Sequence, residues 1–189
     1  MRIIVVAVLL AGAVAAVALL FRSLPAAAER GATSGEAAQA TAELRAQLLH
    51  GTASQFAIPP VAAVWGVLME TAHPEGATTL VALDDGSASL YFSSGGGVIG
   101  GGQHPSINAA ARRLVEIAGR HVSELSATSE FPLPGRGEVK FYALTNNGVL
   151  QGSAREETLG EGSHSLSEMF FAGHDVITGL REITQERND

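Results

Sequence analysis

The chain has 189 residues, contains no cysteine and carries a formal net charge of -7 at pH 7. Proteins that bind nucleic acid present basic patches to the phosphate backbone, so this acidic balance argues against a nucleic-acid partner. It also argues against a domain that spreads electrostatically on anionic lipid. The absence of cysteine excludes a disulfide framework, and it leaves the redox compartment open.

An unbroken apolar run extends from Ile3 to Phe21, between Arg2 and Arg22. A helix needs about 20 apolar residues to span a bilayer, whereas the apolar core of a signal peptide has about 7 to 15. This length favours a membrane anchor within residues 1–24, in contact with the membrane through residues 3–21. Small residues that end at Ala28 suit a signal peptidase, so cleavage there and secretion is the alternative. In either case we expect the domain to lie outside the cytoplasm.

Residues 25–51 are predicted to form a tether rich in Ala, Gly and Ser. Within it, a thin apolar stripe up to Leu49 predicts a short helix, for which Ser34 is an available N-cap. This helix either packs on the domain or stands free. Residues 52–186 have the usual length of one globular domain with its own core.

Alternation of apolar and polar residues predicts strands, which we place at residues 64–71, 78–83, 87–94, 139–144 and 149–154. Asp84-Asp85-Gly86 joins the second strand to the third, and Asn146-Asn147-Gly148 joins the last two. Both sequences are typical of hairpin turns. These strands are therefore expected to pair antiparallel.

Apolar residues at helical spacing predict two amphipathic helices, one from Pro105 to Leu125 and one that starts at a capping box of Ser165 and Glu168. The order of elements predicts an α+β domain: an antiparallel sheet of five or six strands with both helices packed on one face. In outline this resembles profilin-like and roadblock-like folds. A likeness in element order alone carries no function.

The segment Ser93–Gly102 has six glycines between a strand and a helix. It fits G-x-G-x-x-G literally, but the strand belongs to a hairpin, the helix begins only near Pro105, and the position 20 beyond Gly100 is Arg120 where dinucleotide binding requires an acidic residue. We favour a structural role, a bulge or a close helix-to-sheet contact with Val98 and Ile99 as a short central strand. The alternative is a ligand-binding loop, for example an amide nest for a small anion. Its contacts would come from Ser94, Gly95, Gly96, Gly97, Gly100, Gln103 and His104.

The residues that usually carry catalysis form no recognisable constellation in this sequence. The six histidines form neither H-E-x-x-H nor a pair at i and i+4, so no metal site is predicted. No G-x-S-x-G motif occurs, and no cofactor or catalytic residue is expected. His104 and His164 are assigned to the loops before the two helices. His121 is expected to be a hydrogen-bonded histidine at the edge of the apolar stripe.

In the last helix, Phe171 lies about 170° from the centre of the apolar stripe, at about 100° per residue. An outward aromatic residue with His174 and Thr178 close by predicts a partner surface. The alternative is that a neighbouring segment covers Phe171. We therefore favour a non-catalytic domain that binds a protein partner, over a small-ligand sensor or enzyme centred on the glycine-rich loop. A purely structural envelope component would share the same features.

Four strings of the sequence carry a resemblance: Val64–Glu70, Leu80–Gly86, Ser89–Ser93 followed by three glycines at 95–97, and Glu130–Pro134. They resemble motifs of an uncharacterised bacterial protein family. The resemblance covers about residues 64 to 183. It implies a self-contained module and brings no activity, ligand or functional residue.

Overall fold

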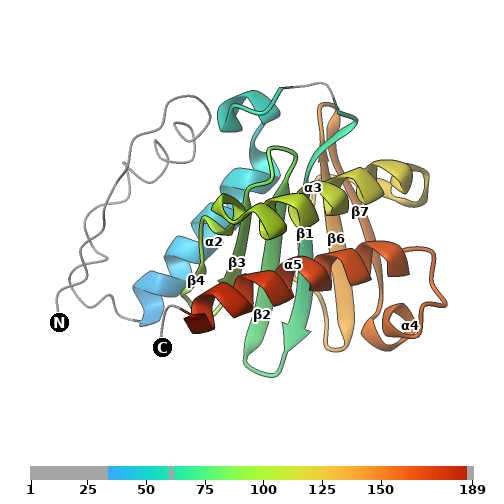
Figure 1. The fold of residues 1–189 in the computed structure, drawn as a ribbon. Coiled ribbons are helices and arrows are strands. Elements are labelled where there is room, and N and C mark those ends of the chain that lie inside the picture. The colour runs from blue at the N-terminus through green and yellow to red at the C-terminus, as the bar shows by residue number, and fades with distance from the viewer. Residues whose placement is uncertain (1–33, 60–61, 187–189) are drawn as a thin grey trace.

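The computed structural model describes residues 34–59 and 62–186 (Figure 1). The apolar run and most of the predicted tether lie outside these residues, as does the cleavage alternative near Ala28, so the anchor stays a prediction. Within the described ranges, no helix combines the length and the apolar character that crossing a bilayer requires.

The described residues form one α+β unit with seven strands and four α-helices. The strands are β1 (Val64–His73), β2 (Gly76–Leu83), β3 (Ala88–Phe92), β4 (Gly97–Val98), β5 (Ser126–Thr128), β6 (Glu138–Thr145) and β7 (Gly148–Arg155). The α-helices are α2 (Ser34–His50), α3 (Pro105–Arg120), α4 (Glu156–Gly160) and α5 (Ser167–Glu186). Short 3-10 helices are η2 (Ala53–Phe56), η3 (Gly101–Gln103) and η4 (Val122–Glu124).

All strands belong to one antiparallel sheet in the order β4-β3-β2-β1-β6-β7-β5. Both predicted hairpins are confirmed, β2 with β3 and β6 with β7. The expected count of five or six strands is wrong, because β4 and β5 add one short strand at each edge. Strands of two and three residues are too short to produce an alternating pattern in the sequence.

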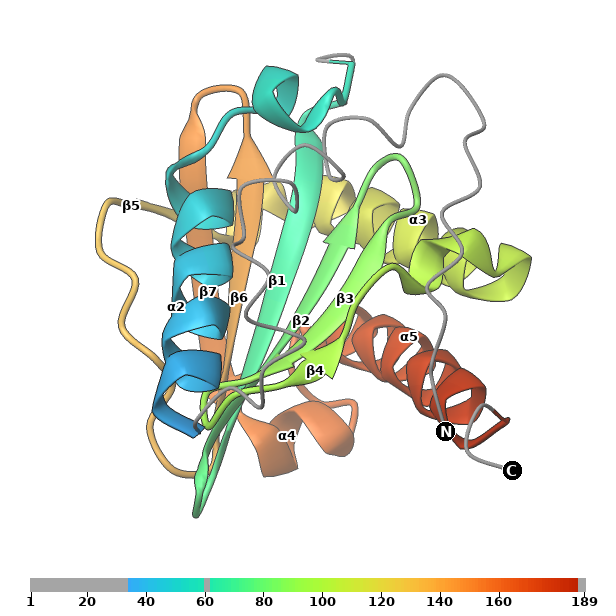
Figure 2. The same ribbon diagram turned by 90° about the vertical axis from the view of Figure 1, so that its left-hand side faces the viewer.

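Helices cover both faces of the sheet, which was expected to carry helices on one face only (Figures 1 and 2). Helices α3 and α5 pack on the face that includes Met69 and Phe141, and α2 lies on the face that includes Leu68 and Tyr142. The first eight residues of β1 are all buried. Because successive side chains of a strand point to opposite faces, such a run requires cover on both.

The start of α5 differs from the predicted capping box. The helix begins at Ser167, two residues beyond the predicted cap. The backbone N–H of Leu166 donates to Nδ1 of His164 at 3.1 Å, and the N–H of His164 donates to the hydroxyl of Ser167 at 3.3 Å. His164 thus satisfies a backbone donor in the loop before the helix, the kind of role assigned to it, and Ser165 is not the cap.

Candidate binding site

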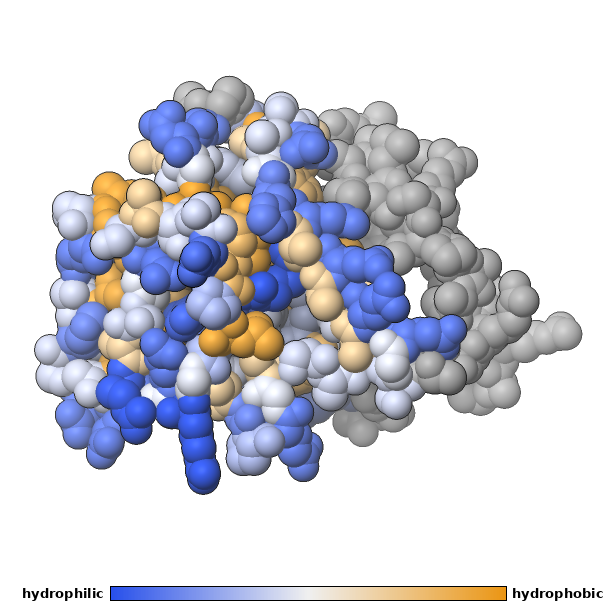
Figure 3. Space-filling model, turned by 180° about the vertical axis from the view of Figure 1, so that it is seen from behind, coloured by the Kyte–Doolittle hydropathy of each residue, from blue (hydrophilic) through white to orange (hydrophobic). Residues whose placement is uncertain are grey.

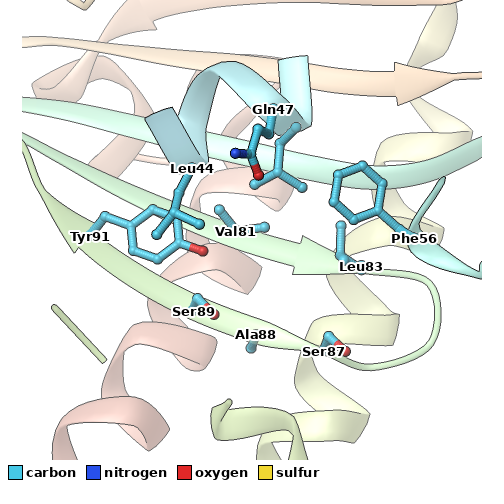
Figure 4. Close-up of a pocket in the computed structure, with 10 residues that line it drawn as sticks. Leu44, Gln47, Phe56, Val81, Leu83, Ser87, Ala88, Ser89 and Tyr91 are labelled. Carbon is cyan, nitrogen blue, oxygen red and sulfur yellow. The ribbon is translucent and has the colours of Figure 1, made fainter. Parts of the chain in front are cut away.

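An apolar groove, here named the α2–β3 groove, lies between helix α2 and strand β3 (Figure 4). Its lining residues are Leu44, Gln47, Leu48, Phe56, Val81, Leu83, Ser87, Ala88, Ser89 and Tyr91, none of which is charged. The groove is small: a water-sized sphere finds about 50 Å³ of room in it, and the space is about 480 Å³ only when open solvent at its mouth is counted. Because an unpaired charge is costly to remove from water, this lining selects an uncharged, apolar group.

The antiparallel register of β2 and β3 builds the floor of the α2–β3 groove. Val81 pairs with Ser89 and Thr79 with Tyr91, so these side chains share one face of the sheet. Leu44 and Leu48 are one helical turn apart on α2 and face them. Burial raises the pKa of Tyr91, which keeps its hydroxyl protonated at neutral pH.

Beside this groove, α2 is fastened to the sheet by a buried ion pair. Arg45 donates from Nε to Oε1 of Glu70 at 2.6 Å and from Nη2 to Oε2 at 2.9 Å. The Glu70 side chain has no exposed surface, and its Oε1 also accepts the hydroxyl of Thr79 at 2.9 Å. Arg45 Nη2 donates in addition to the carbonyl oxygen of Phe131 at 2.9 Å. One arginine therefore joins α2, β1 and the segment before β6.

Electrostatics and the aromatic ring of Tyr142 support this arrangement. Burial lowers the pKa of Arg45, but the hydrogen bond and charge of Glu70 outweigh it, so the pKa lies above its usual value. Burial, followed by the charge of Glu70, raises the pKa of Tyr142 to about 12. The guanidinium carbon lies 5.8 Å from the centre of the Tyr142 ring, within the range of a cation–π contact. The arginine stays charged and the tyrosine neutral at physiological pH.

A second hollow, here named the Leu133 hollow, has about 240 Å³ of room for a water-sized sphere, and about 590 Å³ when open solvent is counted. It is lined by Thr41, Ala42, Arg45, Thr79, Tyr91, Phe92, Ser93 and Leu133. Phe92 and Leu133 are 40% and 46% exposed, so two large apolar side chains border it in contact with water. The one cation that lines it, Arg45, is already paired with Glu70.

The two hollows lie on opposite flanks of α2. At about 100° per residue, Leu44 and Gln47 fall on one side of the line that joins Thr41 and Leu48, and Ala42 falls on the other. Thr41 and Leu48 are buried and face the sheet, and Tyr91 lines both hollows. Figure 3 views this side of the molecule and shows apolar surface exposed among polar groups. Helix α2 therefore forms a ridge between two apolar depressions.

The glycine-rich segment lies along the outer edge of β3. Gly97 and Val98 form β4 and pair with β3, so β4 is an edge strand and not the central strand that was predicted. Gly97 has a φ of 150°, and a side chain on it would collide with the carbonyl oxygen of Leu90. A side chain on Gly95 would collide with Ala37 at the start of α2. Close packing thus accounts for these two glycines.

The other predicted ligand-binding residues are spread along the same segment. Gly96 and Gly100 have open space around them, and Gln103 is exposed in η3. The carbonyl oxygen of His104 accepts the N–H of Asn108 at 2.9 Å, a loop role before α3 as expected. Four surface hollows were compared within residues 34–59 and 62–186. Of the seven predicted ligand-binding residues, Ser94 lines one of these hollows and the other six line none of the four. A ligand-binding role for the loop stays a prediction.

Phe171 faces solvent from α5, as the helical pattern predicts, with 48% of its surface exposed. Its ring meets that of Phe170 edge-on at a centroid distance of 5.8 Å, and Phe170 contacts His174 at 4.4 Å. Burial lowers the pKa of His174, and its Nε2 atom is buried without a hydrogen-bond partner among the described residues. Thr178 is exposed and lines a separate hollow between α3 and α5. Their role as a partner surface stays a prediction.

Residue patterns did not single out Arg45, Glu70, Tyr91 or Leu133. One signal was present: Glu70 is a carboxylate inside a strand whose other residues are mostly apolar. A carboxylate in a strand usually points to solvent, but here α2 covers the face of the sheet on which Glu70 lies. Across residues 34–59 and 62–186, no three or more His, Asp or Glu side chains are arranged to hold a metal ion.

Comparison of the chain with protein-family models, with characterised proteins and with solved structures found no match.

Proposed function

We propose that this chain is a non-catalytic binding domain, tethered to a membrane or exported, which receives an apolar side chain of a protein partner in the α2–β3 groove. The observation that carries the proposal is an apolar groove without a charged lining residue that opens to solvent beside α2. The membrane part rests on the apolar run from Ile3 to Phe21.

The chemistry of the groove supports a peptide side chain as its occupant. Val81 and Tyr91 are buried at the floor of the groove and Leu44 is half-buried at its edge, so the apolar surface left in water is small; covering it gains about 25 cal/mol per Å². The hydroxyls of Ser87 and Ser89 and the amide of Gln47 line the same groove. Such groups can bond the backbone of a bound peptide, which satisfies polar atoms that binding removes from water.

A further feature agrees with a binding role. The exposed Phe171 offers an additional contact region on the opposite side of the sheet. The alternative, a small-ligand sensor at the glycine-rich loop, has less support because two of its glycines have a packing explanation.

The test uses the full chain in mild detergent and peptides selected on it from a phage-displayed random library. Gln47→Trp fills the groove from the exposed surface of α2, and Ala109→Trp on exposed α3 is the matched control. We expect Gln47→Trp to weaken the selected peptides by about tenfold or more and the control to leave binding unchanged. Equal affinities for both variants, or a selection that enriches no peptide, would contradict the proposal. Recovery of the chain from membranes with the residues before Ala28 intact would support the retained anchor.

A further inference from the structure

We propose that a further hollow, here named the Arg181 hollow, binds a small zwitterion that carries a phosphate group and an ammonium group. The hollow has about 250 Å³ of room for a water-sized sphere. It is lined by His73, Glu75, Gly76, Ala77, Thr78, Phe92, Ser93, Ser94 and Arg181. It shares no lining residue with the α2–β3 groove, so this inference does not depend on the partner proposed there.

Two opposite charges line the Arg181 hollow without neutralising each other. Arg181 belongs to α5, and Glu75 belongs to the turn between β1 and β2. Both residues are exposed, and neither side chain forms an ion pair or a hydrogen bond with any residue of the described ranges 34–59 and 62–186. More than 4.0 Å therefore separates their charged atoms. A cation and an anion that border one hollow without direct contact leave room between them for a ligand with the complementary charges.

Serine hydroxyls complete the donor set for the phosphate group. Ser93 is fixed to the start of β2, since its N–H donates to the carbonyl oxygen of Ala77 and its Oγ accepts the N–H of Ala77, both at 2.8 Å. The hydroxyl hydrogen of Ser93 stays available to a ligand, and so does that of Ser94, which has no hydrogen-bond partner among the described residues. Phosphate oxygens accept such hydrogen bonds, and a guanidinium can bind two of them at once.

The carboxylate of Glu75 favours a zwitterion over a simple anion. It repels a phosphate group but accepts hydrogen bonds from an ammonium group. The net charge of the whole chain, -7, also opposes the binding of a simple anion. A ligand that carries both charges turns the repulsion by Glu75 into an attraction. Phosphate esters of ethanolamine have this composition, because a two-carbon link joins their phosphate to an ammonium group.

Such esters have two sources, a lipid headgroup and a soluble metabolite. The Arg181 hollow lies close to the start of α2, since Ser94 is followed by Gly95, on which a side chain would collide with Ala37. The turn between β1 and β2 and the start of α2 lie toward the same end of the sheet (Figure 1). The predicted membrane anchor precedes α2 in the sequence. Both sources present the same two charged groups, and the experiment distinguishes them.

The test titrates the full chain in mild detergent with glycerophosphoethanolamine and, separately, with inorganic phosphate. We expect Arg181→Gln to weaken both by about tenfold or more. Glu75→Gln should weaken glycerophosphoethanolamine and strengthen inorganic phosphate, because it removes both the ammonium partner and the like charge. Arg113→Gln and Glu157→Gln are matched controls at exposed charges that line none of the four hollows, and each should change affinity by less than about twofold. Calorimetry measures binding, and thermal melting checks that each variant is folded.

The source follows from native mass spectrometry of the full chain purified from membranes. A phosphatidylethanolamine that is retained by the parent and lost in Arg181→Gln assigns a lipid headgroup, whereas binding of glycerophosphoethanolamine without retained lipid assigns a soluble ester. Absence of glycerophosphoethanolamine binding, or binding that Arg181→Gln leaves unchanged, would overturn the site. If Glu75→Gln strengthened both probes, the ammonium group would be overturned. None of these results alters the test of the α2–β3 groove with selected peptides.

Discussion

The guanidinium of Arg45 in α2 contacts both carboxylate oxygens of Glu70, a residue of the central strand β1 with no exposed side-chain surface. Two parallel hydrogen bonds fix the angle between the groups as well as their separation. Arg45 also holds the carbonyl of Phe131, and it positions α2 over the sheet together with Thr41, whose hydroxyl donates to the carbonyl oxygen of Phe92 at 3.1 Å, and the buried Leu48 and Leu49. The two hollows beside α2 therefore depend on these contacts as well.

Substitution of Arg45 alone should lower the free energy of unfolding substantially. Arg45→Met leaves the buried carboxylate of Glu70 without its partner, which typically costs about 3 to 5 kcal/mol of unfolding free energy. The double variant Arg45→Met with Glu70→Met leaves no unpaired charge, so we expect it to be more stable than Arg45→Met alone. Urea unfolding of the three chains measures this difference. A single variant as stable as the parent would show that the ion pair does not hold α2.

The contact of His121 with two carboxylates predicts a pH dependence. Its Nδ1 lies 2.8 Å from Glu124 and its Nε2 3.1 Å from Glu168, which also pairs with Arg120. A carboxylate only accepts hydrogen bonds, so both contacts require the doubly protonated ring. Burial lowers the pKa of His121, but the hydrogen bonds to Glu168 and Glu124 outweigh it and raise the pKa above its usual value.

The raised pKa of His121 in the folded state determines how its contribution to stability changes with pH. The stabilisation by His121 is complete below the unfolded pKa of about 6.5 and is lost as the pH rises through the folded value. His121→Gln should therefore destabilise the chain most near pH 6 and least at alkaline pH. The hydrogen bond from His121 lowers the pKa of Glu168, so this contribution falls again in acid, as the pH drops through the lowered value. Melting temperatures of parent and variant across pH measure the difference, and a difference that grows with pH would contradict the assignment.

Substitutions of two glycines by alanine should change the stability of the folded domain in opposite directions. Gly97→Ala places a methyl group against the carbonyl oxygen of Leu90 at a φ of 150°, and we expect it to destabilise by more than about 1 kcal/mol. Gly119→Ala lies in α3 with nothing near its added methyl, and should stabilise by about 0.5 to 1 kcal/mol. Urea unfolding of both variants is the measurement. If Gly97→Ala proved harmless, the packing explanation of the glycine-rich segment would fail.

Adjacent phenylalanines in α5 provide a matched pair. Phe170 is 7% exposed, and Phe170→Ala should cost about 3 to 5 kcal/mol because it leaves a cavity in the core. Phe171 is 48% exposed, and Phe171→Ala should cost less than about 1 kcal/mol. Thermal or urea unfolding separates the two. If both variants lost a similar amount of unfolding free energy, Phe171 would be part of the core. It would then no longer belong to the predicted partner surface.

Local patterns in the sequence were sufficient for the hairpins and the two large helices. The turn sequence Asp84-Asp85-Gly86 and the spacing that begins at Pro105 each depend on residues close along the chain. Phe171 was assigned outward by the same reasoning, since one helix determines its direction.

Features that depend on contacts between residues far apart in the sequence could not be predicted from local patterns. The apolar stripe of α2 is thin, so the sequence left open whether the helix packs or stands free. It packs through the buried Leu48 and Leu49 and through Arg45, whose partner Glu70 lies 25 residues further on. The α2–β3 groove forms where α2 and η2 meet β2 and β3, and the Leu133 hollow forms where α2, β3 and the segment around Leu133 converge. No local periodicity encodes either convergence. The predicted cap at Ser165 failed because His164 and Ser167 satisfy the backbone donors in its place.

The glycine-rich segment also covers the outer edge of β3, where a second chain could otherwise pair. Strand β3 has the sequence ASLYF, which is apolar and uncharged, and its outer edge is followed by β4 and then by η3. An uncovered strand of this composition is a template on which a second chain can add its own strand, the first step toward fibrils. Glycines let the covering backbone lie flat against that edge, close to the carbonyl oxygens of Gly86 and Leu90. The edge strand that remains, β4, has only two residues, so we expect little backbone there for a second chain to pair with at high concentration.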